Sequence, residues 1–354
     1  MIGNPGILPS IRRPVERFPA LITDRFCRSN KFLARRSFLL AALLLLHATA
    51  APAQAPNEKI VFSIPSRSIA SIDLYIAKEK GFFREEGLDV DLVQIRGNVA
   101  MAAALSGQVH ASNGVSTVIR AMERSDLPLK ILTVSLKRNL FWLVARPNIK
   151  SIAGLKNTRL GTTTLGGAQH TAAARLLRKG GLDPDKDVTV IVGGDVPAQL
   201  QSLIAGAIDA AALSPPTVIL ARDKYHMTVL GSAMEDLANL QNGTAVTDKF
   251  LAERRDLVRR ILRARAKGGR YFFENEQGTS EILAKFQRVE YAVALESYRI
   301  SKPAFTTQGI PSDKEVEDFL KADAELLKLA KPASAAKIFD FSLQREVNHE
   351  LGIK

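Results

Sequence analysis

Short segments rich in hydroxyls and glycines follow several apolar runs that predict β-strands. Residues 66–68 place an arginine between two serines, and residues 162–168 place three threonines ahead of two glycines. Hydroxyls and free N–H groups at the start of a helix bind anions, and an arginine can hold a carboxylate, sulfonate or phosphonate by two parallel hydrogen bonds. These residue types therefore indicate capture of an anion.

The candidate contacts lie where ligands bind in open α/β sheets, beyond the carboxyl ends of strands. Predicted strands at 60–64, 90–95 and 158–161 each end at such a segment, and residues 214–217 add a rigid, hydroxyl-bearing rim. The predicted ligand contacts are Ser66, Arg67, Ser68, Asn98, Asn113, Thr163, Thr164, Gly166, Gly167, Ala168, Ser214 and Thr217. Helix N-capping is the alternative role for Ser66, Asn98 and Thr164, and solvent exposure is the alternative for Arg67.

Two further features near these segments have competing interpretations. Arg138 is a second candidate cation, which we expect to be solvated. Phe141 and Trp142 are neighbours on a predicted strand, so their side chains point to opposite faces. We therefore expect one of the two rings in the core and the other in a wall of the cleft.

No pattern typical of metal ligands or nucleotide binding accompanies these segments. His110, His170, His226 and His349 show no i,i+4 pairing and no acidic neighbours at ligand spacing. We expect a surface or capping role for His170, which lies one turn into the helix that follows residues 162–168. Residues 161–167 lack the Gly-Lys-Ser/Thr ending of a P-loop. The sequence therefore predicts neither a metal site nor a cofactor.

The first 53 residues have the pattern of an export signal. Arg35 and Arg36 precede an apolar run at 38–46, which leads into small-x-small segments at 48–50 and 51–53. The run is too short for a membrane-spanning helix, which needs about 20 residues. The twin-arginine and Sec routes both remain open, and both predict a periplasmic protein. The single cysteine, Cys27, lies in this stretch, so the predicted mature chain has no thiol.

The net charge of +13 does not indicate a nucleic-acid partner. Eight of the 49 basic residues but only two of the 36 acidic residues lie in the first 53 positions, and the remaining chain carries +7. Basic residues there recur beside acidic ones and form no stripe with interleaved aromatics. We therefore expect a small-molecule ligand and no nucleic acid.

Beyond residue 53, the pattern predicts an α/β chain with two lobes of like topology. Strands alternate with helical stretches, and the segments 87–89 and 105–111 have counterparts about 100 residues later, at 181–183 and 204–210. Runs at 141–145 and 242–246 predict two strands that cross between the lobes, and the helical stretches 248–276, 280–298 and 312–330 are expected to cover the first lobe. The predicted lobes are 54–145 with 243–354, and 146–242. A cleft between two such lobes is a usual place for a small ligand.

The chain resembles the periplasmic substrate-binding proteins of the nitrate, taurine and aliphatic-sulfonate type of ABC importer, which are grouped with thiamine-pyrimidine precursor proteins. The residues that carry the resemblance are 75–90, which contain Gly81-Phe82-Phe83 and Glu86-Gly87-Leu88, together with 102–107, 155–161 and 203–210. The resemblance covers residues 58–350. It implies a two-lobed type II periplasmic-binding-protein fold and delivery of a solute to a membrane permease.

Three functions compete at this stage. The leading hypothesis is a monomeric, non-enzymatic binding protein that closes on a small anionic organic solute, a sulfonate or a carboxylate, for an ABC transporter permease. An enzyme on the same fold, such as a decarboxylase, is the second, although the cysteine chemistry of the related enzymes has no counterpart in the mature chain. A periplasmic ligand sensor is the third. The sequence does not identify the solute.

Overall fold

The computed structural model describes residues 57–234 and 239–353, which belong to the compact unit Pro56–Lys354. The predicted signal peptide and N-terminal extension, residues 1–53, lie outside the described residues. Of the helices described, none combines the length and the apolar composition that crossing a membrane requires.

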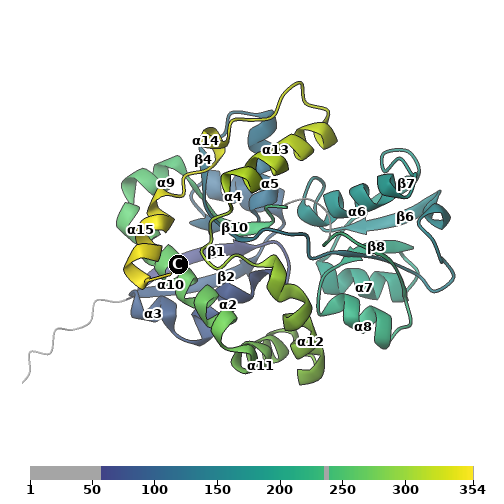
Figure 1. The fold of residues 1–354 in the computed structure, drawn as a ribbon, viewed down its shortest axis with the longest axis horizontal. Coiled ribbons are helices and arrows are strands. Elements are labelled where there is room, and N and C mark those ends of the chain that lie inside the picture. The colour runs from purple at the N-terminus through teal and green to yellow at the C-terminus, as the bar shows by residue number, and fades with distance from the viewer. Residues whose placement is uncertain (1–56, 235–238, 354) are drawn as a thin grey trace, which may run out of the picture. The chain divides into compact units, whose positions relative to one another are not determined.

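Two five-stranded sheets of the same topology form the framework of this unit (Figure 1). The first has the order β2 (Leu88–Gln94), β1 (Glu58–Ile64), β3 (Ala111–Ser112), β10 (Asn242–Thr247), β4 (Leu129–Leu136). The second has the order β7 (Val188–Val192), β6 (Thr158–Thr162), β8 (Ala210–Leu213), β5 (Trp142–Ala145), β9 (Thr228–Ser232). In each sheet the first three strands are parallel and the fourth is antiparallel to its neighbours. The two-lobed α/β fold predicted from the sequence is therefore confirmed.

The sequence repeat corresponds to equivalent turns in the two lobes. Gly107 and Gly206 follow α4 (Gly97–Leu105) and α7 (Val196–Ile204), and both have a left-handed backbone, with φ of 81° and 72°. Glycine is the residue that adopts this conformation without strain, which is why it ends a helix and turns the chain into the next strand.

The antiparallel strand of each sheet comes from a crossing segment. We predicted that residues 141–145 leave the first lobe, but Trp142–Ala145 pairs with β8 and β9, so this strand lies in the second sheet. The first crossing therefore runs ahead of Trp142. β10, predicted as the second crossing, lies between β3 and β4 in the first sheet. An apolar strand has the same pattern on either side of a crossing, so the sequence does not reveal its partners.

Helices cover both faces of each sheet. In the second lobe, α6 (Ala168–Lys179) lies on one face, and α7 and α8 (Thr217–Asp223) lie on the other (Figure 1). The first lobe adds α2 (Ile72–Glu79), α3 (Phe82–Glu85) and α5 (Val115–Arg124) to α4. Its C-terminal helices are α9 (Asp248–Glu253), α10 (Arg255–Glu274), α11 (Glu276–Gln287), α12 (Tyr291–Ser301), α13 (Asp313–Leu327), α14 (Ala335–Ile338) and α15 (Ser342–Leu351).

The C-terminal helices depart from the predicted pattern in two respects. The stretch 248–276 breaks at Arg254, and the stretch 280–298 is divided at Arg288, which has a left-handed backbone. α12 also reaches the second lobe, because Val293 and Ile300 pack against its core. The helices therefore cover the first lobe and also join it to the second.

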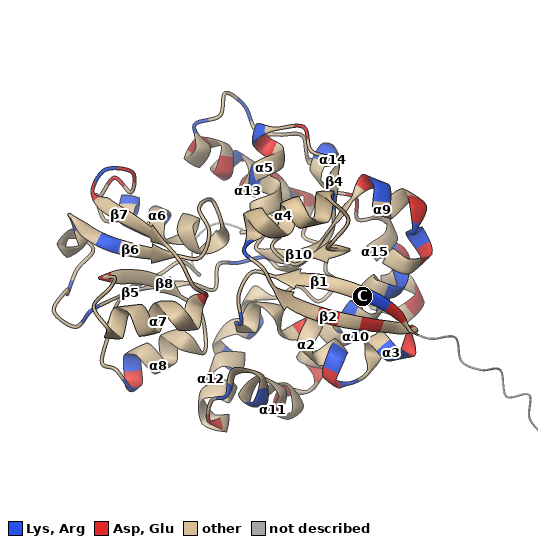
Figure 2. Cartoon of the chain, turned by 180° about the vertical axis from the view of Figure 1, so that it is seen from behind, with Lys and Arg blue, Asp and Glu red and all other residues tan. Residues whose placement is uncertain are grey.

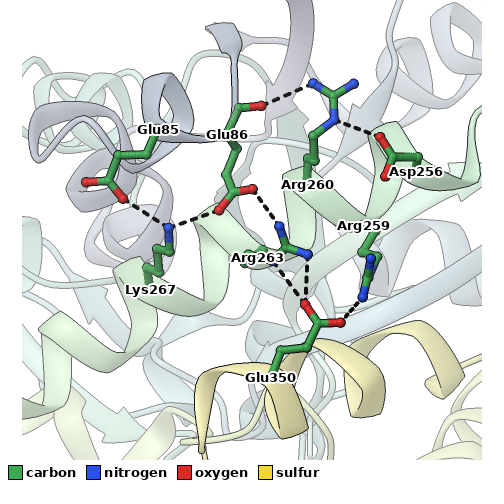
Figure 3. Close-up of polar contacts among 8 residues, drawn as sticks. All are labelled: Glu85, Glu86, Asp256, Arg259, Arg260, Arg263, Lys267 and Glu350. Carbon is green, nitrogen blue, oxygen red and sulfur yellow. Dashed lines mark hydrogen bonds and ion pairs between the residues drawn. The ribbon is translucent and has the colours of Figure 1, made fainter.

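Opposite charges interleave on α3, α9, α10 and α15, at the end of the first lobe that lies away from the second lobe (Figure 2). Figure 3 shows part of this network, in which Glu86 of the α3 end accepts hydrogen bonds from Arg263 and Lys267 of α10, both at 2.9 Å. Arg263 also donates to Glu350 of α15 at 2.7 Å. These pairs link the last helix, α15, to α10 and link α10 to the end of α3, in the first βαβ unit of the chain.

A buried arginine joins the two separate stretches of sequence that form the first lobe. Arg265 of α10 donates to Asp73 Oδ2 of α2, Asn113 Oδ1 and Ser135 Oγ, each at 2.8 Å. Its remaining amino group donates to Thr244 Oγ1 at 3.0 Å and to the Gly243 carbonyl of β10. Because a buried charge without partners is strongly unfavourable, these contacts bind α10 and β10 to the first half of the lobe.

We expect Arg265→Met to lower the free energy of unfolding by about 3–5 kcal/mol, because Asp73 would be left as an unpaired buried carboxylate. The measurement is denaturant unfolding followed by circular dichroism. Arg270→Met, at an exposed position of the same helix, is the matched control and should change it by no more than about 0.5 kcal/mol. Equal effects of the two substitutions would contradict the structural role of Arg265.

Candidate functional site

A cavity of about 40 Å³ lies between the two lobes. From the first lobe and its crossing segments it is lined by Pro65, Ser66, Ser68, Ala70, Gly114, Ser116, Thr117, Phe141, Gln241 and Asn242. From the second lobe it is lined by Thr163, Thr164, Gly167, Ala168, Gln169 and Val196. The cavity thus includes six of the predicted contacts, namely Ser66, Ser68, Thr163, Thr164, Gly167 and Ala168.

Helix N-termini from both lobes meet at this cavity. α5 begins after Gly114 and brings Ser116 and Thr117 to it, and α6 begins after Gly167 and brings Ala168 and Gln169. The first N–H groups of an α-helix have no partner within the helix and carry a partial positive charge. The cavity is therefore suited to an atom that accepts hydrogen bonds.

Gln169 braces the second-lobe wall. Its Oε1 accepts from the Thr163 N–H at 2.7 Å, and its Nε2 donates to the Ala212 carbonyl at 2.7 Å and to Gln199 Oε1 at 3.2 Å. With both ends of its amide held, the side chain fixes the turn at Thr163 against β8 and α7. It is a supporting residue of the site.

Two lining residues have buried polar atoms without a hydrogen-bond partner among the described residues. These are Oγ1 of Thr164 and Nδ2 of Asn242, in side chains 5% and 2% exposed. Thr164 belongs to the second lobe, and Asn242 is the first residue of β10 in the first lobe. Buried polar groups are nearly always paired, so unpaired ones at a cavity point to a ligand.

The described residues that line the cavity include no titratable side chain. Arg67 is the arginine among the predicted contacts. Its side chain is 57% exposed, and its Nε lies 3.4 Å from Asp195 Oδ2 of the second lobe. The predicted hold of Arg67 on an anion stays a prediction, since its guanidinium lies outside the lining and bridges the lobes instead.

Several further contacts join the lobes around the cavity. Ser66 Oγ accepts from the Val196 N–H at 3.2 Å, and the Ile69 N–H donates to the Pro215 carbonyl at 3.4 Å. Arg120 of α5 donates to the Gly166 carbonyl at 3.0 Å. The structure thus shows the lobes in contact around this cavity.

A fully buried carboxylate also spans the lobes. Asp323 of α13 accepts from Arg120 at 2.9 Å and from Arg175 of α6, in the second lobe, at 3.2 Å. Burial, reinforced by nearby Asp323, raises the pKa of Glu123 to about 8, although Arg120 and Arg124 act in the opposite direction. The ion pairs of Asp323 favour the arrangement in which α6 lies against α13.

A second, larger cavity of about 530 Å³ collects two other predicted contacts, Asn98 and Gly166. It shares Thr117 with the first cavity and also includes His170, whose Nδ1 accepts from the Gly166 N–H at 3.3 Å. Burial and then Arg120 lower the pKa of His170, which keeps the ring neutral and able to accept this bond. His170 thus holds the backbone of the turn that precedes α6.

The remaining predicted contacts lie outside both linings. Asn113 is fully buried, with its carbonyl oxygen bound to Arg265 and its amide donating to Ser71 Oγ at 2.9 Å. Ser214 and Thr217 are buried on the second lobe, and Arg138 is exposed, as we expected for it. The ligand roles of Asn113, Ser214 and Thr217 stay predictions.

The structure adds lining residues that sequence analysis did not select. Ser116 and Thr117 lie in the first turn of the helix that follows Asn113-Gly114. They could have been selected from the sequence, because polar residues at the start of a helix that follows a strand are candidate ligand contacts. Gln241 and Asn242 belong to no motif in the sequence. Phe141 lines the cavity and also belongs to the buried core of the second lobe, whereas Trp142 is half-buried and packs against that core. The expected division of the two rings between core and cleft wall is therefore not a clean one.

No group of three or more His, Cys, Asp or Glu side chains in the described part of the chain is placed to hold a metal ion.

The comparisons with known proteins agree with this architecture. A family model described as NMT1/THI5 like matches residues 68–278. The riboflavin-binding protein RibY of Chloroflexus aurantiacus is 29% identical over 203 residues, which are 55% of this chain and 56% of that protein. The chain matches less than two thirds of the length of the curated relatives found.

Solved structures share the fold at low sequence identity. The alkanesulfonate-binding protein SsuA from Xanthomonas axonopodis pv. citri has a TM-score of 0.66 at 17% identity, with 81% of this chain and all of that chain covered. The desulfurization enzyme DSZB has a TM-score of 0.60 at 14% identity, with coverage of 83% and 99%. The periplasmic-binding fold implied by the sequence resemblance is therefore confirmed.

A substitution at Gly167 tests whether the lobes can approach each other only because this residue has no side chain. A Cβ at this residue would lie 3.2 Å from the Thr164 carbonyl oxygen and 3.6 Å from Thr117 Oγ1 of the opposite lobe, so a larger side chain would extend into the narrow space between the lobes. We expect Gly167→Leu to hold the lobes apart and raise the radius of gyration in small-angle X-ray scattering, with the melting temperature kept.

Gly193→Leu is the control, because a Cβ at that exposed second-lobe glycine meets no atom within 4 Å. An unchanged radius of gyration in Gly167→Leu would show that the contact at Gly167 does not limit lobe approach.

Proposed function

Because the chain belongs to the NMT1/THI5-like family, we propose that it is a solute-binding protein of an ABC importer. In this proposal the protein is exported to the periplasm as a monomer and captures a small anionic organic solute between its lobes. It then delivers the solute to a membrane permease.

The observation that carries the proposal is the smaller of the two cavities between the lobes, whose described lining offers hydrogen-bond donors and no titratable group. General acid–base catalysis needs a titratable side chain within reach of the reacting atoms. The described lining supplies hydroxyls, amides and helix N-termini instead. Such a set can bind a solute reversibly and lacks the groups that would transform it.

The size of the cavity supports a solute with a compact head group. One water molecule needs about 10–15 Å³ of such space, so 40 Å³ accepts a group of about three or four atoms. A carboxylate or a sulfonate has this size. A longer solute would hold its remaining atoms outside this cavity or between lobes that stand further apart.

An anionic head group fits the electrostatics of the cavity. The N-termini of α5 and α6 stabilise negative charge, each by about 0.3–1 kcal/mol at exposed sites and more when water is excluded. The names of the similar proteins mention riboflavin and alkanesulfonates. Of these two ligand types, we favour the sulfonate, because its head group matches the cavity in size and charge.

The alternative of an enzyme has a specific ground in the fold of DSZB, a desulfurization enzyme. The lining of the cavity favours binding over turnover. Incubation with a bound solute, followed by mass spectrometry of the solute, separates the two functions. Recovery of the solute unchanged supports the binding protein, and a new product supports the enzyme.

Thermal unfolding against a panel of sulfonates, carboxylates, pyrimidines, flavins and inorganic anions tests the proposal. A solute present at 100 times its Kd adds about 2.7 kcal/mol to the stability of the native state, which raises the melting temperature. We expect this effect for at least one sulfonate or carboxylate. A protein freed of copurified small molecules by unfolding and refolding that responds to no solute would contradict the proposal.

A further inference from the structure

Asn242 and Thr164 line the same cavity from opposite lobes, and each has a buried polar atom without a partner among the described residues. Both side chains are more than nine-tenths buried, and no hydrogen bond from the described residues reaches Asn242 Nδ2 or Thr164 Oγ1. A buried donor without an acceptor is unfavourable relative to the same group in water. Approach of the lobes therefore removes water from two groups that the protein itself does not pair.

The backbone at Asn242 is fixed by its neighbours. The pairing of β10 with β4 shifts register between Asn242 and Gly243, and such irregularities turn a side chain away from the regular direction of a strand. A Cβ at Gly243 would collide with the Thr133 carbonyl, so the strands approach closely there. The Gly243 carbonyl accepts from Arg265, and its N–H donates to the Asn113 carbonyl at 3.1 Å.

The opposite group is held just as firmly. Thr164 lies in the turn that ends at Gly167, where the Gly167 N–H donates to the Thr164 carbonyl at 3.1 Å. The adjacent Thr163 N–H is held by Gln169. Both unpartnered atoms are therefore placed by rigid surroundings, which is the condition for selective binding.

We propose that Asn242 and Thr164 bind the oxyanion head group of the solute, with the Asn242 amide donating from the first lobe and the Thr164 hydroxyl from the second. The inference rests on the proposed function and adds the chemistry of the head group, which is an oxyanion. A solute whose head group only donates, such as an ammonium, leaves the Asn242 amide unpaired and is rejected. Because closure without a solute leaves the Asn242 amide and the Thr164 hydroxyl unpaired, these two residues also make closure of the lobes depend on the solute.

The test uses methanesulfonate, acetate and methylammonium as probes, with Kd measured by isothermal titration calorimetry on the full chain. Wild-type protein should bind at least one of the two oxyanions and not methylammonium. Asn242→Asp keeps the shape but replaces the donor by a negative charge, and should weaken oxyanion binding by at least about 100-fold. Thr164→Val removes only the hydroxyl and should weaken it by about tenfold or more.

Two matched controls separate these effects from general ones. Asn148→Asp introduces the same charge at an exposed loop position of the second lobe. Thr279→Val removes another buried, unpartnered hydroxyl, which lies on α11 and does not line the cavity. Both controls should keep the wild-type Kd within about twofold, and melting temperatures of all variants verify folding.

The possible results separate the subsite formed by Asn242 and Thr164 from the proposed function of solute binding. Loss of oxyanion binding in Asn242→Asp and Thr164→Val, with normal binding in the controls, supports the subsite. Oxyanion binding that is unchanged in folded Asn242→Asp or Thr164→Val overturns the subsite and leaves the proposed function standing. If the wild type binds neither oxyanion and responds to no solute of the wider panel, the subsite and the proposed function are both overturned. If it responds to another solute, the Kd of that solute is compared between the wild type, Asn242→Asp and Thr164→Val in the same way.

Discussion

The guanidinium of Arg265 is the constraint on which the site depends. It is buried among groups from α2, β4, β10 and the turn after β3, so it joins the residues before the second lobe to those that follow it. Its bond to the Gly243 carbonyl also fixes the backbone beside Asn242. About 100 residues of the second lobe separate the two stretches of sequence that form the first lobe, and Arg265 holds the later stretch against the earlier one. Arg265 thus holds Asn113 and Gly243, which are the chain neighbours of the lining residues Gly114 and Asn242.

Two opposing sets of contacts act on the approach of the lobes. Asp323 holds one arginine from each lobe, Ser66 accepts from the start of α7, and α12 packs against the second core. These contacts favour the closed arrangement. The unpartnered atoms of Thr164 and Asn242 disfavour it, because closure removes their water without supplying a partner. The oxyanion head group of the solute resolves the conflict, which is how binding energy becomes lobe closure in the proposed function.

Local patterns in the sequence predicted the fold well and the site in part. The strands at Leu88–Gln94 and Val188–Val192 and the helix start at Gly167 follow from periodicity and glycine placement. Ser66 and Thr164 were found because hydroxyls after strands occupy one edge of a sheet. Arg67 was placed in the site by its chemistry, yet it extends to Asp195, a residue 128 positions away whose proximity no local pattern reveals. Asn242 was missed because its position depends on strand pairing and a register shift.

Closure of the two lobes on a solute can be measured directly as a change in the distance between them. Spin labels at Ala102→Cys on α4 and Lys179→Cys on α6, both exposed positions, report on the two lobes when Cys27 is replaced by serine. Electron–electron double resonance should show a broad or longer distance without solute and a shorter, narrower one at saturation with the solute identified in the thermal panel. A solute that binds while this distance distribution stays unchanged would contradict the account.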